Sequence, residues 1–114
     1  AEAYACQDAA IRLWPEPLVG WKVGLVAPSL RPEFGAERLV GPIFQSLLRP
    51  INAELMTCPV FVGGFAAVEA EFVFRVARDV PPGQVEWTEA EAASYMGGLY
   101  VGVEIASSRS VSAA

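Results

Sequence analysis

The stretch that decides the fold is Ala67-Val68-Glu69-Ala70-Glu71-Phe72-Val73-Phe74-Arg75-Val76. Its β-branched and aromatic residues predict a strand, and alternate side chains of a strand point to the same face. One face therefore carries Glu69, Glu71, Val73 and Arg75. The opposite face is wholly apolar, and we expect it to lie in a hydrophobic core. Its residues are Val68, Ala70, Phe72, Phe74 and Val76.

Glu69 and Glu71 place two anions roughly 7 Å apart along this strand, the spacing of residues i and i+2. Two like charges on a half-buried surface are unfavourable unless a cation lies between them. Carboxylate oxygens are the ligands that hard divalent cations prefer. The pair therefore indicates a metal site.

Length and composition limit the function classes. A chain of 114 residues fits one domain, 1–114, and 54% hydrophobic residues with 18% charged residues is a globular composition. The low charge suggests that a partner subunit or further chain covers much of the surface. A net charge of −5 without a basic run argues against nucleic-acid binding.

Histidine is absent, which excludes histidine-based triads, dyads and zinc sites within this chain. Cys6 and Cys58 form no CxxC or zinc-ligand spacing, so we expect reduced thiols and a cytoplasmic location, with no signal peptide. The longest uncharged stretch, residues 55–68, is too short to span a membrane.

Local patterns predict a helix over residues 1–13, ended by Pro15 and Pro17. Strands are expected over 18–26, around 41–44, over 59–62, 67–77 and 99–106, with a loop over 28–37. Thr88 and Glu91 form a capping-box pattern, which predicts a short helix to about Tyr95, ended by Gly97-Gly98. This mixture favours an α+β, mainly β domain with a strand-rich core over about 18–106.

Two further ionisable residues, Lys22 and Glu104, lie in the middle of predicted strands with apolar neighbours. For any one such residue, the usual explanation is an edge strand whose charged side faces water. Three carboxylates with one divalent cation, however, carry a net charge of −1, which Lys22 would neutralise. The candidate site is therefore Lys22, Glu69, Glu71 and Glu104.

The order and spacing of these residues resemble the 2-keto-4-pentenoate hydratases of the fumarylacetoacetate hydrolase superfamily. The matching segments are Gly20-Trp21-Lys22-Val23-Gly24-Leu25, Gly41-Pro42-Ile43-Phe44, Val68-Glu69-Ala70-Glu71-Phe72, Ala77-Arg78-Asp79 and Val103-Glu104-Ile105 through Ser108-Arg109, with Ala3-Tyr4-Ala5-Cys6-Gln7 similar to the family's N-terminal helix.

The resemblance implies a β-sandwich roll with a few short helices, assembled as a homo-oligomer. It implies that Glu69, Glu71 and Glu104 bind Mg²⁺ or Mn²⁺ and that Lys22 lies near the substrate. The implied reaction adds water to a 2-hydroxy-2,4-dienoate and gives a 4-hydroxy-2-oxo acid, in the degradation of aromatic compounds. The missing histidine favours the hydratase and decarboxylase branch, because hydrolase relatives activate water with a histidine–glutamate pair.

The chain departs from the family pattern in length. It stops soon after Glu104, so we expect an incomplete domain that lacks the C-terminal half of the sandwich. Two alternatives stay open. One is a 4-oxalocrotonate-type decarboxylase of the same family, and the other is a non-catalytic remnant that joins a complex, for example with a decarboxylase partner.

Overall fold

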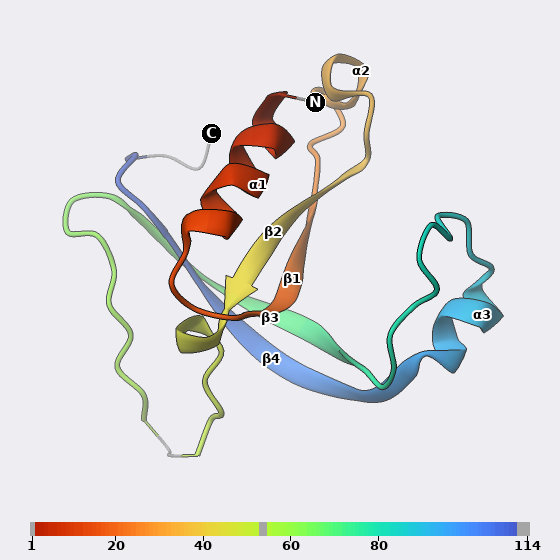
Figure 1. The fold of residues 1–114 in the computed structure, drawn as a ribbon. Helices are drawn as coiled ribbons and strands as arrows, with labels where there is room; N and C mark the ends of the chain where they lie inside the picture. Colours follow the sequence, from red (N-terminus) through yellow and green to blue (C-terminus); the bar gives the residue numbers. More distant parts are fainter. Residues whose placement is uncertain (1, 53–54, 112–114) are drawn as a thin grey trace. The chain divides into compact units, whose positions relative to one another are not determined.

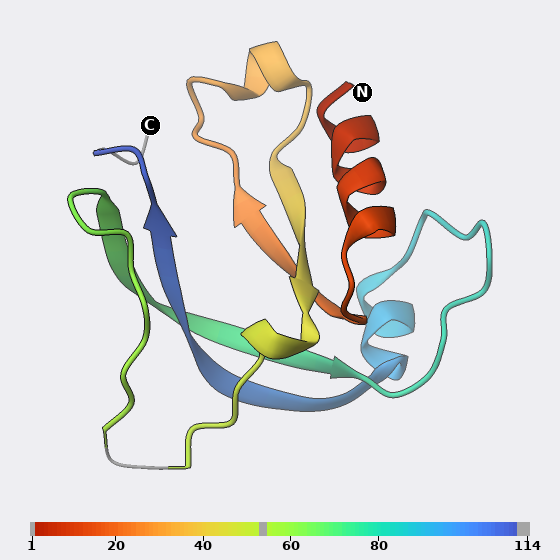
Figure 2. The same ribbon diagram turned by 60° about the vertical axis from the view of Figure 1, so that its left-hand side comes forward.

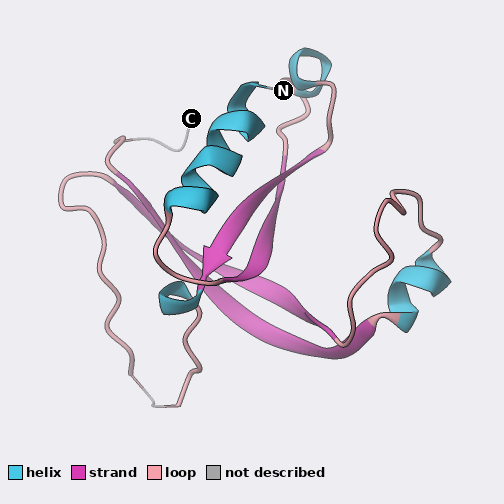
Figure 3. Ribbon diagram, viewed as in Figure 1, coloured by secondary structure: helices cyan, strands magenta, loops and turns pink. Residues whose placement is uncertain are grey.

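The structure is a computed structural model that describes residues 2–52 and 55–111. The chain divides into two compact units, Ala1–Glu54 and Leu55–Ala114. Each unit is built around a two-stranded antiparallel sheet, with strands β1 and β2 in the first and β3 and β4 in the second (Figures 1 and 3). The described residues thus form a small, mainly β protein with a few helices, which agrees with the expected α+β, mainly β class.

The first unit contains helix α1 (Glu2–Leu13), strand β1 (Leu18–Leu25), helix α2 (Arg31–Phe34), strand β2 (Arg38–Phe44) and the 3-10 helix η1 (Gln45–Leu47). Helix α1 ends where Pro15 and Pro17 remove backbone donors. Strands β1 and β2 pair antiparallel, with an irregularity in the register between Leu18 and Gly20.

Helix α1 protects the outer edge of β2. The backbone N–H of Val40 donates to the Tyr4 hydroxyl at 3.1 Å, and the Gln7 side-chain amide donates to the Val40 carbonyl at 2.9 Å. Unpaired backbone groups at a sheet edge invite pairing with other chains, and this helix satisfies two of them. At the other end of β2, Trp14 stacks on Phe44 at 4.8 Å between ring centroids.

The second unit contains strand β3 (Phe65–Val76), helix α3 (Glu89–Ser94) and strand β4 (Met96–Ser108). Strands β3 and β4 run side by side along their whole length as one long antiparallel hairpin (Figures 1 and 2). The segment between them contains α3, whose capping box is formed as predicted. The Glu91 N–H donates to Thr88 Oγ1 at 3.2 Å, and the Thr88 N–H donates to Glu91 Oε2 at 2.8 Å.

Three local predictions were wrong. Residues 59–62 form no strand, because they lead into the turn before β3 without a neighbouring strand to pair with. The expected loop over 28–37 contains the short helix α2, which begins near Pro32 and ends at Gly35 in the left-handed conformation. Gly97 and Gly98 do not end α3 but lie inside β4, which begins at Met96.

The predicted burial of the apolar strand face was also wrong. Val68 is 74% exposed, and Phe72 is 73% exposed. The reason is that β3 and β4 form a two-stranded sheet, so alternation separates the two faces but supplies no layer to cover either. Among the described residues, the buried hydrophobic side chains are Val26 and Phe44, both in the first unit.

The helices of residues 2–52 and 55–111 are all short. None of them combines the length and the apolar character that a membrane-spanning helix requires.

Candidate metal centre

The hairpin register brings the three predicted carboxylates together. Glu69 on β3 stands directly opposite Glu104 on β4. Glu71 follows two residues along β3, on the same face, and its cross-strand partner is Gly102. Two antiparallel strands thus position the Glu69-x-Glu71 pair and Glu104 on one side of one hairpin.

The three side chains converge. One carboxylate oxygen from each of Glu69, Glu71 and Glu104 lies within 4.8 Å of the other two. Glu69 is exposed, whereas Glu71 and Glu104 are half-buried, and the Oε2 atom of Glu104 is shielded from solvent. The cluster is open to solvent on the side of Glu69 and enclosed on the side of Glu104.

The register creates an electrostatic cost. Like charges directly opposite each other on a sheet are destabilising, and Glu69 and Glu104 occupy such a pair. Glu71 adds a third negative charge to the same face. A cation bound between the three carboxylates would offset this repulsion.

The donor set fits a hard divalent cation. Oxygens on opposite sides of Mg²⁺ stand about 4.2 Å apart, and those around the larger Ca²⁺ about 5 Å apart. The 4.8 Å limit within the cluster lies between these values, so small rotations of the glutamate side chains would suffice for Mg²⁺ or Mn²⁺. Three carboxylates without imidazole or thiolate select such ions over zinc or copper.

A glycine keeps the neighbourhood of Glu71 compact. A Cβ atom on Gly102 would come within 2.8 Å of Cγ2 of Val73, which follows Glu71 by two residues on the same face. The Val73 side chain therefore occupies the space that a larger residue at position 102 would need. Sequence analysis did not single out Gly102, because its importance arises from pairing across the hairpin.

Lys22, the fourth predicted site residue, lies in the middle of β1 opposite Gly41 and is half-buried. It belongs to the first unit, whereas the three glutamates belong to the second. The structure thus brings three of the four predicted site residues together, and the role of Lys22 stays a prediction.

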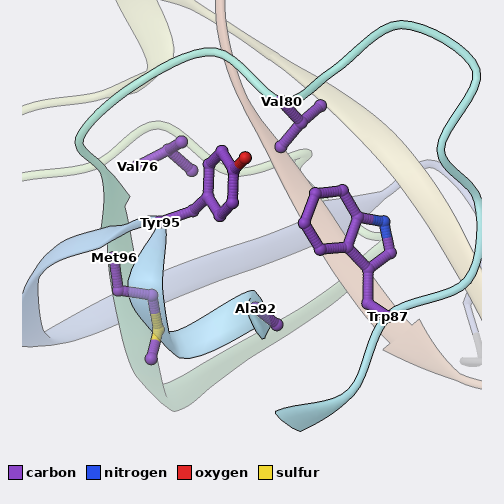
Figure 4. Close-up of a pocket in the computed structure, with 6 residues that line it drawn as sticks. All are labelled: Val76, Val80, Trp87, Ala92, Tyr95 and Met96. Atoms are coloured by element: carbon purple, nitrogen blue, oxygen red, sulfur yellow. The ribbon is translucent and has the colours of Figure 1, made fainter. Parts of the chain in front are cut away.

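The second unit also contains an apolar pocket that sequence analysis missed (Figure 4). Its volume is about 230 Å³, and its lining residues are Val76, Val80, Trp87, Ala92, Tyr95 and Met96. Trp87 meets Tyr95 edge to face at 5.1 Å, and the Arg78 guanidinium lies 4.2 Å above the Tyr95 ring. Its lining side chains include no carboxylate, so the glutamate cluster remains the better candidate for chemistry.

Comparisons with known proteins found no relative. No family profile matches this chain, and no curated protein or solved structure is significantly similar to it. Any assignment of function therefore depends on the residues and their geometry.

Proposed function

We propose that this chain belongs to a metal-dependent hydratase of the 2-keto-4-pentenoate type, with the β-sandwich roll of the fumarylacetoacetate hydrolase superfamily. In this proposal it adds water to a 2-hydroxy-2,4-dienoate and forms a 4-hydroxy-2-oxo acid. The observation that carries the proposal is the convergence of Glu69, Glu71 and Glu104 from two strands. The spacing of the segments around Lys22 and these glutamates supports the choice of family.

The three glutamates would hold Mg²⁺ or Mn²⁺, which supplies Lewis-acid stabilisation of negative charge on the keto oxygen of a bound 2-oxo acid. The glutamate oxygens fill only part of the coordination shell of such an ion. A substrate would reach such an ion from the exposed side of the cluster, beside Glu69.

Proton transfer in this proposal falls to Lys22. Adding water to a conjugated dienoate requires a proton to be moved at carbon, and the sequence contains no histidine for that role. A lysine ammonium can carry this proton or stabilise the substrate carboxylate. A reducing, cytoplasmic setting is part of the proposal, and it is supported by two free, exposed thiols at Cys6 and Cys58.

Metal binding is tested by Mn²⁺ titration, followed by the relaxation of water protons or by calorimetry. We expect one site in the parent chain. Glu69→Gln, Glu71→Gln and Glu104→Gln should each weaken binding by at least about tenfold, because each removes one charged ligand. Glu86→Gln is the matched control, since Glu86 lies in the loop of the same unit outside the cluster. If all four variants bound Mn²⁺ with the affinity of the parent chain, the proposal would lose its basis.

Turnover is tested with 2-hydroxypenta-2,4-dienoate and Mn²⁺, by following the loss of dienoate absorbance and the products. Lys22→Met should lower the rate by roughly 100-fold or more and leave Mn²⁺ affinity unchanged, as expected for a proton-transfer group that is not a ligand. Release of CO₂ from a 2-oxo dicarboxylate, without hydration of the dienoate, would favour the decarboxylase alternative.

The second candidate function is a non-catalytic subunit of a complex, for example with a decarboxylase partner. The observation that favours it is the large exposed apolar surface, typical of a chain that is covered by another. This alternative would be supported by a folded sample that binds Mn²⁺ but does not turn over substrate by itself. The same sample should then turn over substrate when it is mixed with a decarboxylase.

A further inference from the structure

The three glutamates occupy three corners of a set of four neighbouring positions on one face of the β3–β4 hairpin. Glu69 stands opposite Glu104. Glu71, the next residue of that face on β3, stands opposite Gly102. Residues directly opposite each other on a sheet have Cβ atoms about 5 Å apart, and residues i and i+2 of one strand stand roughly 7 Å apart. The fourth corner therefore has no side chain, and we call it the Gly102 corner.

The Gly102 corner is open toward the glutamates. Apart from the chain neighbours of Gly102, the one described atom within 4 Å of a Cβ placed there is Cγ2 of Val73, at 2.8 Å. The glutamate side chains do not come this close, so they do not extend over the corner. Val73 follows Glu71 on the same face and borders the corner on the side away from Glu69. Carboxylates thus lie on one side of the corner and an apolar side chain on the other.

The apolar side of the corner continues along the hairpin. Val73 stands opposite Tyr100, and their side chains are 40% and 51% exposed. The Tyr100 ring leans away from the corner, since it lies 3.0 Å from the place that a Cβ on Gly98 would take. The face therefore changes from acidic to apolar, with the Gly102 corner between the two parts. A small molecule with oxygen atoms at one end and a carbon chain at the other matches this order.

We propose that the Gly102 corner receives a small 2-oxo acid, with its oxygens toward the glutamates and its carbon chain against Val73. The inference rests on the proposed function and adds two residues, Gly102 and Val73, that limit the size of the substrate. A hard divalent cation takes about six oxygen ligands, more than the single oxygens of three glutamates provide. The carboxylate and keto oxygens of a 2-oxo acid are ligands of the kind that such an ion prefers.

The charge of the set also favours an anionic ligand at a glycine corner. Three carboxylates with one divalent cation carry a net charge of −1, and an acidic residue at position 102 would make it −2. A 2-oxo acid is itself an anion, so a further negative charge within a few ångströms would weaken its binding. A larger neutral residue would avoid this repulsion but fill the corner. Glycine provides room without adding charge.

The test uses 2-oxopentanoate, a five-carbon 2-oxo acid without an alkene to hydrate, so that binding is measured apart from turnover. Calorimetric titration of the parent chain should show one molecule bound with saturating Mn²⁺ and none without Mn²⁺. Gly102→Ala should weaken this binding at least about tenfold, because the added methyl group enters the corner. The Mn²⁺ affinity of this variant should stay within about twofold of that of the parent, since no glutamate is changed.

A second pair of variants removes the contact that the new methyl group makes with Val73. Val73→Ala by itself should weaken 2-oxopentanoate binding roughly threefold and leave oxalate binding unchanged, because oxalate has no carbon chain to lie against position 73. Adding Gly102→Ala to Val73→Ala should weaken the binding of both ligands about tenfold. Circular dichroism checks that each variant keeps the sheet signal.

Ala106→Val is the matched control. Ala106 lies on the same face of β4, two residues beyond Glu104 and on the side of the glutamates away from the corner. The variant adds bulk beside the cluster without reaching the Gly102 corner. Its affinity for 2-oxopentanoate should therefore equal that of the parent.

The outcomes separate this inference from the proposed function. A folded parent that binds no Mn²⁺ would overturn both. A parent that binds Mn²⁺ but no 2-oxopentanoate would overturn the inference alone. The same holds if Gly102→Ala binds 2-oxopentanoate as tightly as the parent, if it lowers the Mn²⁺ affinity tenfold, or if Ala106→Val has the larger effect.

Discussion

At the scale of single residues, Glu69 and Glu104 belong to a site that can be predicted only in part from the sequence. Each is an acidic residue within a strand-forming run, and sequence reasoning named both as candidate ligands. Their direct cross-strand pairing, and the approach of all three carboxylates to within 4.8 Å, depend on the register of the hairpin. Glu71 was predictable as the same-face neighbour of Glu69, because side chains alternate along a strand.

Gly64, directly before β3, is the position in the second unit where a side chain has the least room. A Cβ atom there would collide with the backbone carbonyl oxygen of Ser108, which cannot rotate away as a side chain can. We expect Gly64→Ala to destabilise the second unit by about 1–3 kcal/mol, as overpacking against rigid atoms does. Faster hydrogen exchange of the amides in β3 and β4 would show the loss.

Gly41→Ala is the matched control for this substitution, because nothing lies within 4 Å of the position its Cβ would take. The Gly41→Ala substitution should change the free energy of unfolding by no more than about 0.5 kcal/mol. A Gly64→Ala variant with the exchange rates of the parent would contradict the geometry at Ser108.

At the scale of elements, α3 demonstrates the strongest local signal in the chain. The Thr88–Glu91 pattern predicted a capping box, and both reciprocal bonds are present. The backbone N–H of Thr88 and its hydroxyl both donate to the Glu91 carboxylate. These bonds, the backbone one with the larger effect, lower the pKa of Glu91 below its usual value of 4.5. The bonding is local, within three residues, so it could be predicted without knowledge of the tertiary fold.

This lowered pKa predicts a pH dependence of α3. A carboxyl whose pKa is lower in the folded state stabilises that state fully above its unfolded pKa, and the contribution is lost as pH falls through the folded pKa. The first-turn amides of α3 should therefore exchange faster, relative to their intrinsic rates, as the pH drops below about 4.5. Native-state hydrogen exchange across this range measures the effect.

Glu91→Gln serves as the comparison, because it keeps an acceptor but removes the titrating charge. Its α3 amides should show no such acid-dependent change, while Thr88→Ala should raise their exchange about fivefold at neutral pH. An acid-dependent loss of equal size in Glu91→Gln would show that another group is responsible.

The hairpin illustrates the limit of element-scale prediction. The strand pattern correctly separated a charged face from an apolar face on β3, yet it wrongly placed the apolar face in a core. Phe72, Val101 and their neighbours are exposed because burial requires a second layer, and the alternation of one strand holds no information about that layer.

At the scale of the whole molecule, stability should depend on what the chain binds. Few side chains are buried among residues 2–52 and 55–111, so the free energy of folding from packing within the chain is small. A ligand that binds only the folded state adds stability by mass action. We therefore expect metal binding at the glutamate cluster to raise the free energy of unfolding.

Mn²⁺ at 100 times its dissociation constant should raise the free energy of unfolding of the second unit by about 2.7 kcal/mol. Thermal unfolding of the parent chain with Mn²⁺ or with a chelator measures the shift. Glu69→Gln and Glu104→Gln should show little shift at the same Mn²⁺ concentration, and Glu86→Gln should keep it. The same upward shift in every variant would indicate metal binding elsewhere on the chain.

The sequence by itself determined the local features of this protein: the helix before Pro15, the capped helix α3, the approximate positions of the four strands β1 to β4 and the sharing of one face by Glu69 and Glu71. These depend on backbone sterics and on hydrogen bonds between near neighbours. The tertiary structure alone decided that Glu104 faces Glu69, that Gly102 makes room for Val73 and that the apolar face of β3 lies in solvent. Register and burial depend on pairing between residues far apart in the chain, which local patterns do not specify.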